Sequence, residues 1–207
     1  MTVSGNPILP EHLYKGIQNN FYVEAGGGYP FFFDIIEGAI ENILTLYNNG
    51  QRTFDRLVVA LDSEDATFEE KHREITAFVE ARILNLSPTI QFKLIIQHFC
   101  FEAWALGNRK LVKGNLHNPL LIKYRRLFNV GTKDPELLPP NDEEELNRAQ
   151  FANKLLRLYF NEKFRNLTYS KNNPKPLCHD GYFLQLKSRL NDTGHIESFK
   201  GFLTAFV

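Results

Sequence analysis

Three acidic side chains follow two apolar segments in a pattern that could hold a divalent cation. Glu24 ends the segment "NFYV" and precedes three glycines, while Asp62 and Glu64 follow the segment "FDRLVVAL". Carboxylates that converge repel one another unless a cation offsets their charge, and an all-oxygen ligand set suits Mg²⁺ or Mn²⁺. Such an ion polarises a phosphodiester and lowers the pKa of an attacking water. The pattern therefore indicates a metal site for phosphate chemistry, with Glu24 as a metal ligand or general base.

Other polar residues follow the same kind of segment. Asp65 closes the cluster "DSED", where it suits either a metal ligand or a cap beside the positive end of the next helix. His98 and Glu102 follow a third apolar segment, "TIQFKLIIQ". Both are functional candidates, but each also has a structural interpretation. His98 could be a buried, hydrogen-bonded histidine, and Glu102 could be a buried carboxylate that needs a partner.

The elements that would position these residues alternate between strand and helix from residue 20 to residue 108. Strands are predicted over 20–23, 54–61 and 89–97, and the β-branched run at 54–61 is typical of a strand buried on both faces. Helices are predicted over 31–47, over 67–84 behind a capping box of Thr67 and Glu70, and after residue 100. This alternation favours an α/β fold with a mostly parallel sheet, whose ligands bind beyond the carboxyl ends of the strands.

Helical patterns replace the alternation in the second half of the chain. A capped helix is predicted over 142–164 and two helical pieces over 182–206, with loops between them. We therefore expect three parts. They are an N-terminal segment at 1–19, an α/β core at 20–112, and a mostly helical extension at 113–207 that packs on the core.

The acidic pattern resembles the TOPRIM fold, in which one strand ends in Glu and a later strand ends in an acidic pair. The matching residues are Glu24 in "YVEAGGG" and Asp62 with Glu64 in "VVALDSED". The segment "IIQHFCFEAWALGNRKLV" is similar to part of the RloB-like proteins, a TOPRIM group of bacterial anti-phage loci, and residues 182–202 resemble the same group. Glu64 stands where Asp is usual, and an additional strand and helix of the standard fold are missing before "DSED".

The resemblance implies a Rossmann-like TOPRIM core, as in OLD-type nucleases, and a Mg²⁺- or Mn²⁺-dependent nuclease. Such an enzyme would hydrolyse phosphodiester bonds in DNA or RNA, including tRNA, as an effector of anti-phage defence. The implied catalytic residues are Glu24, Asp62 and Glu64, with Asp65 as a further metal ligand. Lys110 or Lys187 would stabilise negative charge in the transition state. An ATPase partner of the ABC or AAA type is also implied, and a homo-oligomer stays open.

Basic residues cluster between 103 and 133 although the net charge of the chain is zero. No acidic residue occurs in that stretch. A basic patch binds phosphate backbones largely without reading their sequence, but lysines on a solvated helix face produce the same pattern. The candidates for nucleic-acid binding are Arg109, Lys110, Lys113, Lys123, Arg125 and Arg126.

Two other functions stay open beside the nuclease. A non-catalytic TOPRIM-like subunit would use the same sheet edge for binding, and it would regulate, or be regulated by, an ATPase partner. A phosphoryl-transfer enzyme for small molecules lacks support because the sequence has no GxxxxGK[ST] loop. The two cysteines favour reduced thiols in a cytoplasm, and no apolar run of about 18 residues could span a membrane.

Overall fold

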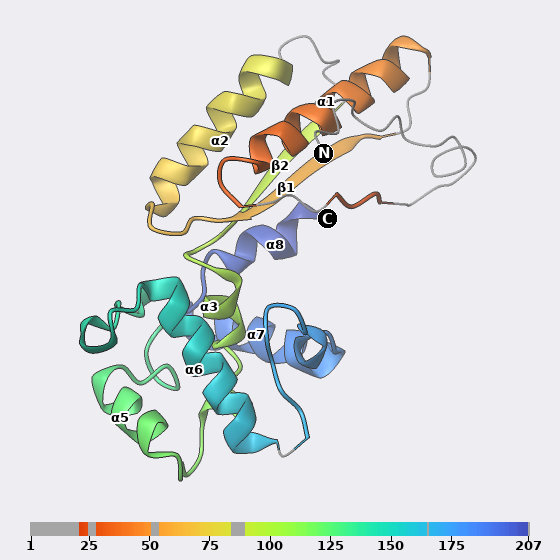
Figure 1. The fold of residues 1–207 in the computed structure, drawn as a ribbon. Coiled ribbons are helices and arrows are strands. Elements are labelled where there is room, and N and C mark those ends of the chain that lie inside the picture. Colours follow the sequence, from red (N-terminus) through yellow and green to blue (C-terminus); the bar gives the residue numbers. More distant parts are fainter. Residues whose placement is uncertain (1–20, 25–27, 51–53, 84–89, 165, 207) are drawn as a thin grey trace. The chain divides into compact units, whose positions relative to one another are not determined.

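The computed structural model describes residues 21–24, 28–50, 54–83, 90–164 and 166–206 (Figure 1). The expected N-terminal segment at 1–19 lies outside these residues. The chain divides into two compact units. The first holds Arg73–Leu94 and the described residues up to Val59, and the second holds Ala60–His72 and the described residues from Ile95 onward. The expected boundary at residue 112 stays a prediction, and residues 95–112 share a unit with the helical second half.

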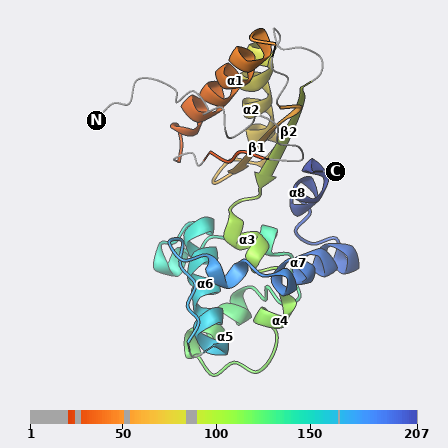
Figure 2. The same cartoon turned by 90° about the vertical axis from the view of Figure 1, so that its right-hand side faces the viewer.

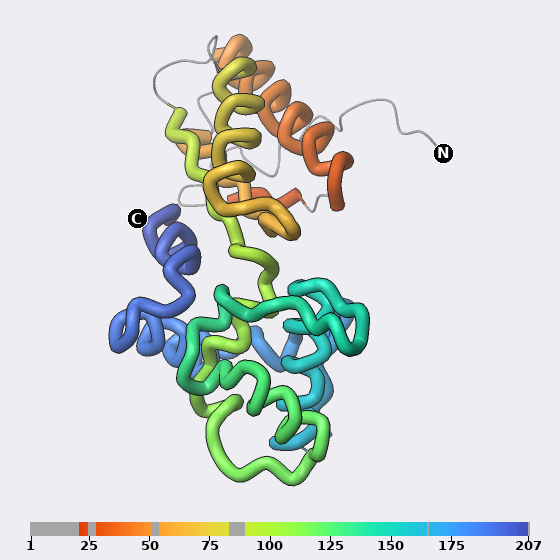
Figure 3. Tube along the Cα trace, turned by 90° about the vertical axis from the view of Figure 1, so that its left-hand side faces the viewer, coloured from red at the N-terminus to blue at the C-terminus, as the bar shows by residue number. Residues whose placement is uncertain are grey.

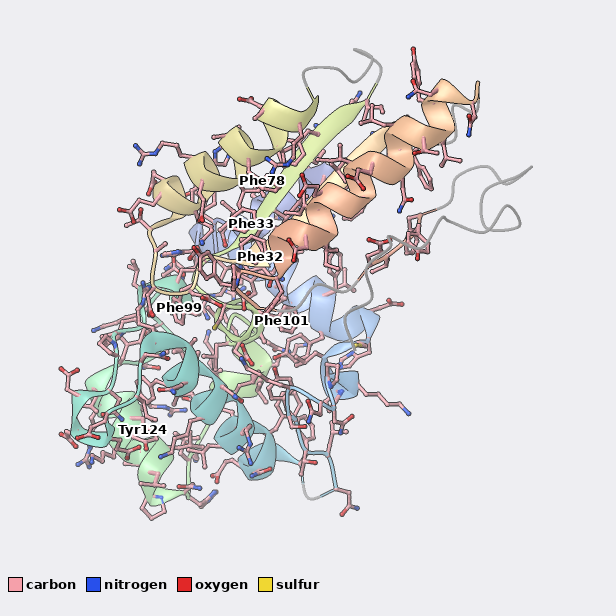
Figure 4. The ribbon with its side chains drawn as sticks, turned by 45° about the horizontal axis from the view of Figure 1, so that its top comes forward. Phe32, Phe33, Phe78, Phe99, Phe101 and Tyr124 are labelled. Carbon is pink, nitrogen blue, oxygen red and sulfur yellow. The ribbon has the colours of Figure 1, made fainter. Side chains whose placement is uncertain are left out.

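The first unit is built on helices α1 (Phe32–Asn48) and α2 (Phe68–Ile83), whose last eleven residues belong to it. Both helices agree with the predicted ranges. Phe33 of α1 packs against Phe78 of α2 with their ring centroids 4.6 Å apart (Figure 4). The guanidinium of Arg82 lies 3.6 Å from the centre of the Phe78 ring and donates a 3.0 Å hydrogen bond to Glu37. An aromatic contact and a charged pair therefore fasten the two helices together.

The sheet contains two parallel strands in the described part of the chain, β1 (Arg56–Asp62) and β2 (Gln91–Gln97). The protein is therefore mixed α/β, as expected, with a sheet flanked by helices (Figure 2). Leu57 and Val59 of β1 are buried, whereas Val58 between them is half-buried and Ala60 is exposed. The prediction that this strand is buried on both faces is wrong, because alternate side chains point to opposite faces and only one face is well covered.

The predicted strand over 20–23 is not present in its described part, residues 21–23. Phe21 and Val23 have exposed fractions of 80% and 72%. A short apolar run has strand propensity, but it becomes a strand only where a neighbour completes its backbone hydrogen bonds and covers its side chains. Residue 20 lies outside the described residues, as do residues 25–27 with two of the three glycines.

The second unit includes the first turn of α2 and the turn that precedes it. The predicted capping box is confirmed, since the Glu70 backbone N–H donates to Thr67 Oγ1 at 3.2 Å and the Thr67 N–H donates to Glu70 Oε2 at 2.9 Å. Six α-helices follow in the described chain after β2 (Figure 3). They are α3 (Phe101–Ala105), α4 (Arg109–Val112), α5 (Pro119–Leu127), α6 (Arg148–Lys163), α7 (Asp180–Thr193) and α8 (Phe199–Ala205).

Helix α6 is the centre of this second unit. It begins at Arg148, not near residue 142, because Asn147 and Gln150 form its capping box and Asp142–Glu144 make a separate 3₁₀ turn. Tyr124 of α5 packs edge-on against Phe151 of α6, with ring centroids 5.1 Å apart. No helix of the described chain is both long enough and apolar enough to cross a membrane.

Candidate functional site

The chain leaves β1 at Asp62 and runs beside the residues that follow β2. The Ser63 N–H donates to the Gln97 carbonyl at 3.1 Å, and the Glu64 N–H donates to the Phe99 carbonyl at 2.9 Å. Glu64 has a φ of 53°, in the left-handed region, which turns the chain toward the start of α2. These bonds place the acidic turn after β1 beside the N-terminus of α3, all within the second unit.

The Asp62 carboxylate has one satisfied and one unsatisfied oxygen. It accepts a hydrogen bond from the Phe101 backbone N–H, at the first residue of α3. Its Oδ1 atom is buried and has no hydrogen-bond partner in the described part of the protein. Burial is the main cause that raises the pKa of Asp62 to about 7, and the charges of Glu102 and Glu64 add to it. A cation at Oδ1 would satisfy this oxygen and favour the ionised carboxylate.

Glu102 is the buried carboxylate of the site, with an exposed fraction of 2%. The Tyr169 hydroxyl donates a 3.0 Å hydrogen bond to its Oε1 atom, and the Cys100 thiol also hydrogen-bonds to it. Burial, then the charge of Glu102, raises the pKa of Cys100 above its usual range, so this thiol stays protonated. Glu102 thus has the partners that its structural interpretation requires, and its negative charge also acts on Asp62.

The positive charge of a basic residue, Lys171, also acts on Asp62. Its positive charge lowers the pKa of Asp62, against the effects of burial and of the two glutamates. Tyr169 and Lys171 lie in one loop. This loop is distant in the sequence from the helix that it contacts, since Tyr169 follows its partner Glu102 by 67 residues. Sequence reasoning missed both residues in this role, because no local pattern marks a loop that folds back onto a distant helix.

His98 takes part in a structural network. Its Nδ1 atom lies 2.9 Å from Ser63 Oγ, and its backbone N–H donates to Ser198 Oγ at 3.1 Å. Ser63 is fully buried, and burial, assisted by the charge of Arg148, lowers the pKa of His98 below its usual value. The imidazole thus contacts the turn after β1 and the backbone N–H of His98 bonds to the N-cap residue of α8, which agrees with the structural interpretation of this histidine.

The other candidate metal ligands are placed as follows. Glu24 belongs to the first unit, whereas Asp62 and Glu64 belong to the second, so a joint site of these three residues stays a prediction. Asp65 is exposed in the turn before α2. Within the described residues, no group of three or more His, Cys, Asp or Glu side chains is arranged to hold a metal ion.

A hydrated Mg²⁺ nevertheless fits the residues present. Magnesium usually keeps several waters and binds proteins through one or two carboxylates together with a substrate phosphate. Asp62 offers a buried, unpartnered oxygen, and Glu64 offers an exposed carboxylate two residues later. These two residues would hold the ion, and the negative charge of Glu102 would increase the local affinity for it.

The basic candidates divide into paired and free side chains. Arg109 is paired with Asp192, and Lys123 with Glu143 at 2.6 Å. Arg125 donates to the carbonyl oxygens of Gly114 and Val112, so it holds the backbone in place. The side chains that are exposed and have no hydrogen-bond or ion-pair partner within the described chain are Lys110, Lys113, Arg126 and Lys187.

Arg126 also borders a hollow in the surface. This hollow has a volume of about 400 Å³ and is lined by Gly114, Asn115, Leu116, Ile122, Arg125 and Arg126. Two arginines and a loop segment therefore line a space large enough for a nucleotide-sized group. The hollow belongs to the second unit and is formed by α5 and the loop before it.

Comparison with known proteins gives no relative: no protein-family model, no curated protein and no solved structure matches this chain. The resemblance to TOPRIM and RloB-like proteins therefore rests on the quoted sequence segments. That resemblance stays a hypothesis, and the geometry of Asp62 and its neighbours is independent of it.

Proposed function

We propose that this chain is a Mg²⁺- or Mn²⁺-dependent nuclease of the TOPRIM type, which cleaves phosphodiester bonds in DNA or RNA. The observation that carries the proposal is the state of Asp62. Its Oδ1 atom is buried without a partner at the end of a strand, next to two more carboxylates and one lysine. Burial of an ionised carboxylate is costly unless a cation compensates it, so a cation site explains why this residue is an aspartate.

Each residue of the site has a distinct part in this proposal. Asp62 and Glu64 bind the ion, which when bound polarises the phosphodiester and supplies a water of lowered pKa. Glu102 adds negative charge without touching solvent, and the hydrogen bond from Tyr169 holds it in place. Glu24 provides a third oxygen ligand or takes the proton of the attacking water.

Nucleic acid is the proposed substrate because free basic side chains lie on the same unit as Asp62. Lys110, Lys113 and Arg126 are exposed and would contact phosphates, largely independently of base sequence. A role in anti-phage defence, an ABC- or AAA-type ATPase partner and assembly into a homo-oligomer are further parts of the proposal. They derive from the RloB-like segments of the sequence.

One observation favours a second candidate, a non-catalytic TOPRIM-like subunit. The described residues contain no group of three potential metal ligands, and catalysis by one ion held by two carboxylates would need help from Glu24. A subunit that binds a nucleotide or an ATPase partner at the same acidic turn would need no third ligand.

A cleavage assay separates the two candidates. The protein is incubated with single-stranded DNA, duplex DNA and tRNA in the presence of Mg²⁺ or Mn²⁺. We expect cleavage that falls at least about a hundredfold in Asp62→Asn, in line with the loss of several kcal/mol of transition-state stabilisation by the metal. Asp55→Asn is the matched control, because Asp55 is exposed immediately before the opposite end of the same strand.

Two results would contradict the proposal. If the unaltered protein cleaves none of these substrates with either metal, the nuclease assignment fails and the binding subunit is favoured. If Asp62→Asn cleaves as fast as the unaltered protein, the nuclease has another active site.

A further inference from the structure

The hollow of the second unit is bounded by a loop that charged side chains of α6 hold in place. Lys163 Nζ donates a 2.7 Å hydrogen bond to the Lys113 carbonyl, where the loop leaves α4. Near the other end of the loop, the Glu162 carboxylate accepts a 2.5 Å hydrogen bond from the His117 N–H. The loop is therefore anchored at both ends, and little of its backbone has to be ordered when a ligand binds.

Two arginines of α5 bring positive charge to this hollow. Arg125 donates to the carbonyl oxygens of Gly114 and Val112 at 2.8 and 2.9 Å, and it forms no ion pair with any residue that the structure describes. Arg126 is exposed and has neither a hydrogen bond nor an ion pair in the described chain. Both residues line the hollow. A guanidinium with free N–H donors matches the geometry of a phosphate group.

The loop adds unpaired backbone donors to the arginines. The N–H groups of Gly114, Asn115 and Leu116 have no hydrogen-bond partner among the described residues, and all three residues line the hollow. Gly114 has a φ of 115°, which L side chains rarely adopt, and a Cβ atom there would lie only 3.0 Å from Lys163 Nζ. Glycine thus permits this loop conformation, and unpaired N–H groups in a loop favour an anion.

The remaining wall and the size of the hollow indicate more than a bare anion. Leu116 and Ile122 are half-buried and give the hollow an apolar side. Its volume of about 400 Å³ lies within the range of roughly 300–1,000 Å³ that is typical of small-molecule sites. Orthophosphate would leave much of this space unfilled, whereas a nucleotide has both an anionic group and a flat base that an apolar surface can cover.

We propose that this hollow binds a nucleotide by its phosphate monoester. Arg126 and the loop N–H groups hold the phosphate, the base lies against Leu116 and Ile122, and Arg125 positions the loop. The inference goes beyond the proposed nuclease, because it uses neither Asp62 nor a divalent cation. The same phosphate monoester occurs in a free nucleotide and at the 5′ end of a nucleic-acid strand.

The test is calorimetric binding of thymidine 5′-monophosphate to the full chain in the presence of EDTA. Arg126→Ala should weaken binding about tenfold or more, the effect of losing a hydrogen bond between charged groups. Arg126→Lys should retain part of the affinity, because it keeps the charge but loses the planar fork. Arg157→Ala is the matched control, since Arg157 is an exposed arginine of α6 outside the hollow.

A second variant tests the loop without removing an arginine. Asn115→Asp adds a negative charge to the lining of the hollow at nearly constant size, so it should also weaken binding of the nucleotide. Asn172→Asp, at an exposed position outside the hollow, should bind as the unaltered protein does. Circular dichroism confirms that these exposed substitutions leave the fold intact.

The choice of probe identifies the ligand. Thymidine should show no measurable binding, and orthophosphate should bind more weakly than the nucleotide. A 5′-phosphorylated oligothymidylate that binds more tightly than the mononucleotide, and through Arg126, would identify the source as a strand end. Tighter binding of the mononucleotide would identify a free nucleotide.

Three results would overturn the inference. They are an unaltered protein that does not bind the mononucleotide in EDTA, Arg126→Ala that binds it with unchanged affinity, and orthophosphate that binds as tightly as the nucleotide. Because EDTA removes the divalent cations, none of these results depends on the metal site at Asp62. Failure of the nuclease assay would likewise leave the nucleotide site standing.

Discussion

The Tyr169 hydroxyl donates a 3.0 Å hydrogen bond to Oε1 of Glu102, which lies 67 residues earlier in the chain. Both residues are buried, with exposed fractions of 4% and 2%. Glu102 is the carboxylate whose charge acts most strongly on Asp62. This single bond thus joins the loop of Lys171 to the helix that borders the acidic turn, and it satisfies a buried acid that would otherwise destabilise the fold.

Tyr169→Phe should lower the free energy of unfolding by about 1.5–3 kcal/mol. It removes a donor from a buried carboxylate, and an unsatisfied buried acceptor costs more than the lost bond alone. The measurement is urea unfolding monitored by circular dichroism. Tyr22→Phe is the control, because the Tyr22 ring is 43% exposed and its hydroxyl should contribute little. Equal stability of the two variants would show that the Glu102 hydrogen bond carries no net stabilisation.

Binding of Mn²⁺ should depend on Asp62. Asp62→Asn keeps the size of the side chain but removes its negative charge, so we expect Mn²⁺ affinity to fall at least tenfold in a calorimetric titration at pH 8. Asp55→Asn should leave the affinity unchanged. Loss of affinity in both variants, or in neither, would mean that the ion binds somewhere other than the end of β1.

Removing the free basic side chains should change the salt dependence of nucleic-acid binding. Lys110→Ala combined with Arg126→Ala removes two proposed phosphate contacts, and each contact contributes roughly 0.9 to the slope of log affinity against log salt concentration. The slope should therefore decrease by about 2, as measured by fluorescence anisotropy on a labelled duplex. Lys200→Ala, an exposed residue of α8, is the control. An unchanged slope in the double variant would place the nucleic acid on another surface.

The stability of the protein should depend on pH through Glu136. Trp104 Nε1 donates to its Oε1 atom at 3.2 Å, Ser198 Oγ donates to the same atom, and the residue is 6% exposed. Burial raises the pKa of Glu136 from 4.5 to about 7, although the Ser198 and Trp104 donors oppose this shift. Between these pH values the unfolded chain releases a proton that the folded protein keeps.

The free energy of unfolding should therefore fall as pH rises from about 4.5 to about 7, by up to about 3 kcal/mol from this residue, and should stay level above that range. Glu136→Gln imitates the protonated side chain and should remove this part of the decline. Urea unfolding at pH 5, 6 and 8 measures it. Glu197→Gln, an exposed substitution nearby in sequence, should keep the full decline. A decline of the same size in Glu136→Gln would contradict the assignment.

The helices near the site could be predicted because their signals are local. Thr67 and Glu70 form the expected capping box at the start of α2, and apolar residues at helical spacing place α1 within one residue of its predicted range. Helix α6 starts later than predicted because the acidic run at 142–145 looked like a helix start, whereas Asn147 and Gln150 supply the actual capping box. Both the acidic run and Asn147 are possible starts of this helix. The choice between them depends on tertiary contacts that the sequence does not show.

The sequence by itself determined the alternation of helix and strand after residue 31 and the acidic residues at the end of β1. These follow from periodicity, from capping residues and from strand propensity, all of which act over a few residues. Only the tertiary structure decided which groups surround Asp62, because Tyr169 and Lys171 arrive from a loop whose position depends on packing against α3 and α6. Tertiary structure also decided that residues 21–23 form no strand, since a strand requires a partner for its backbone groups.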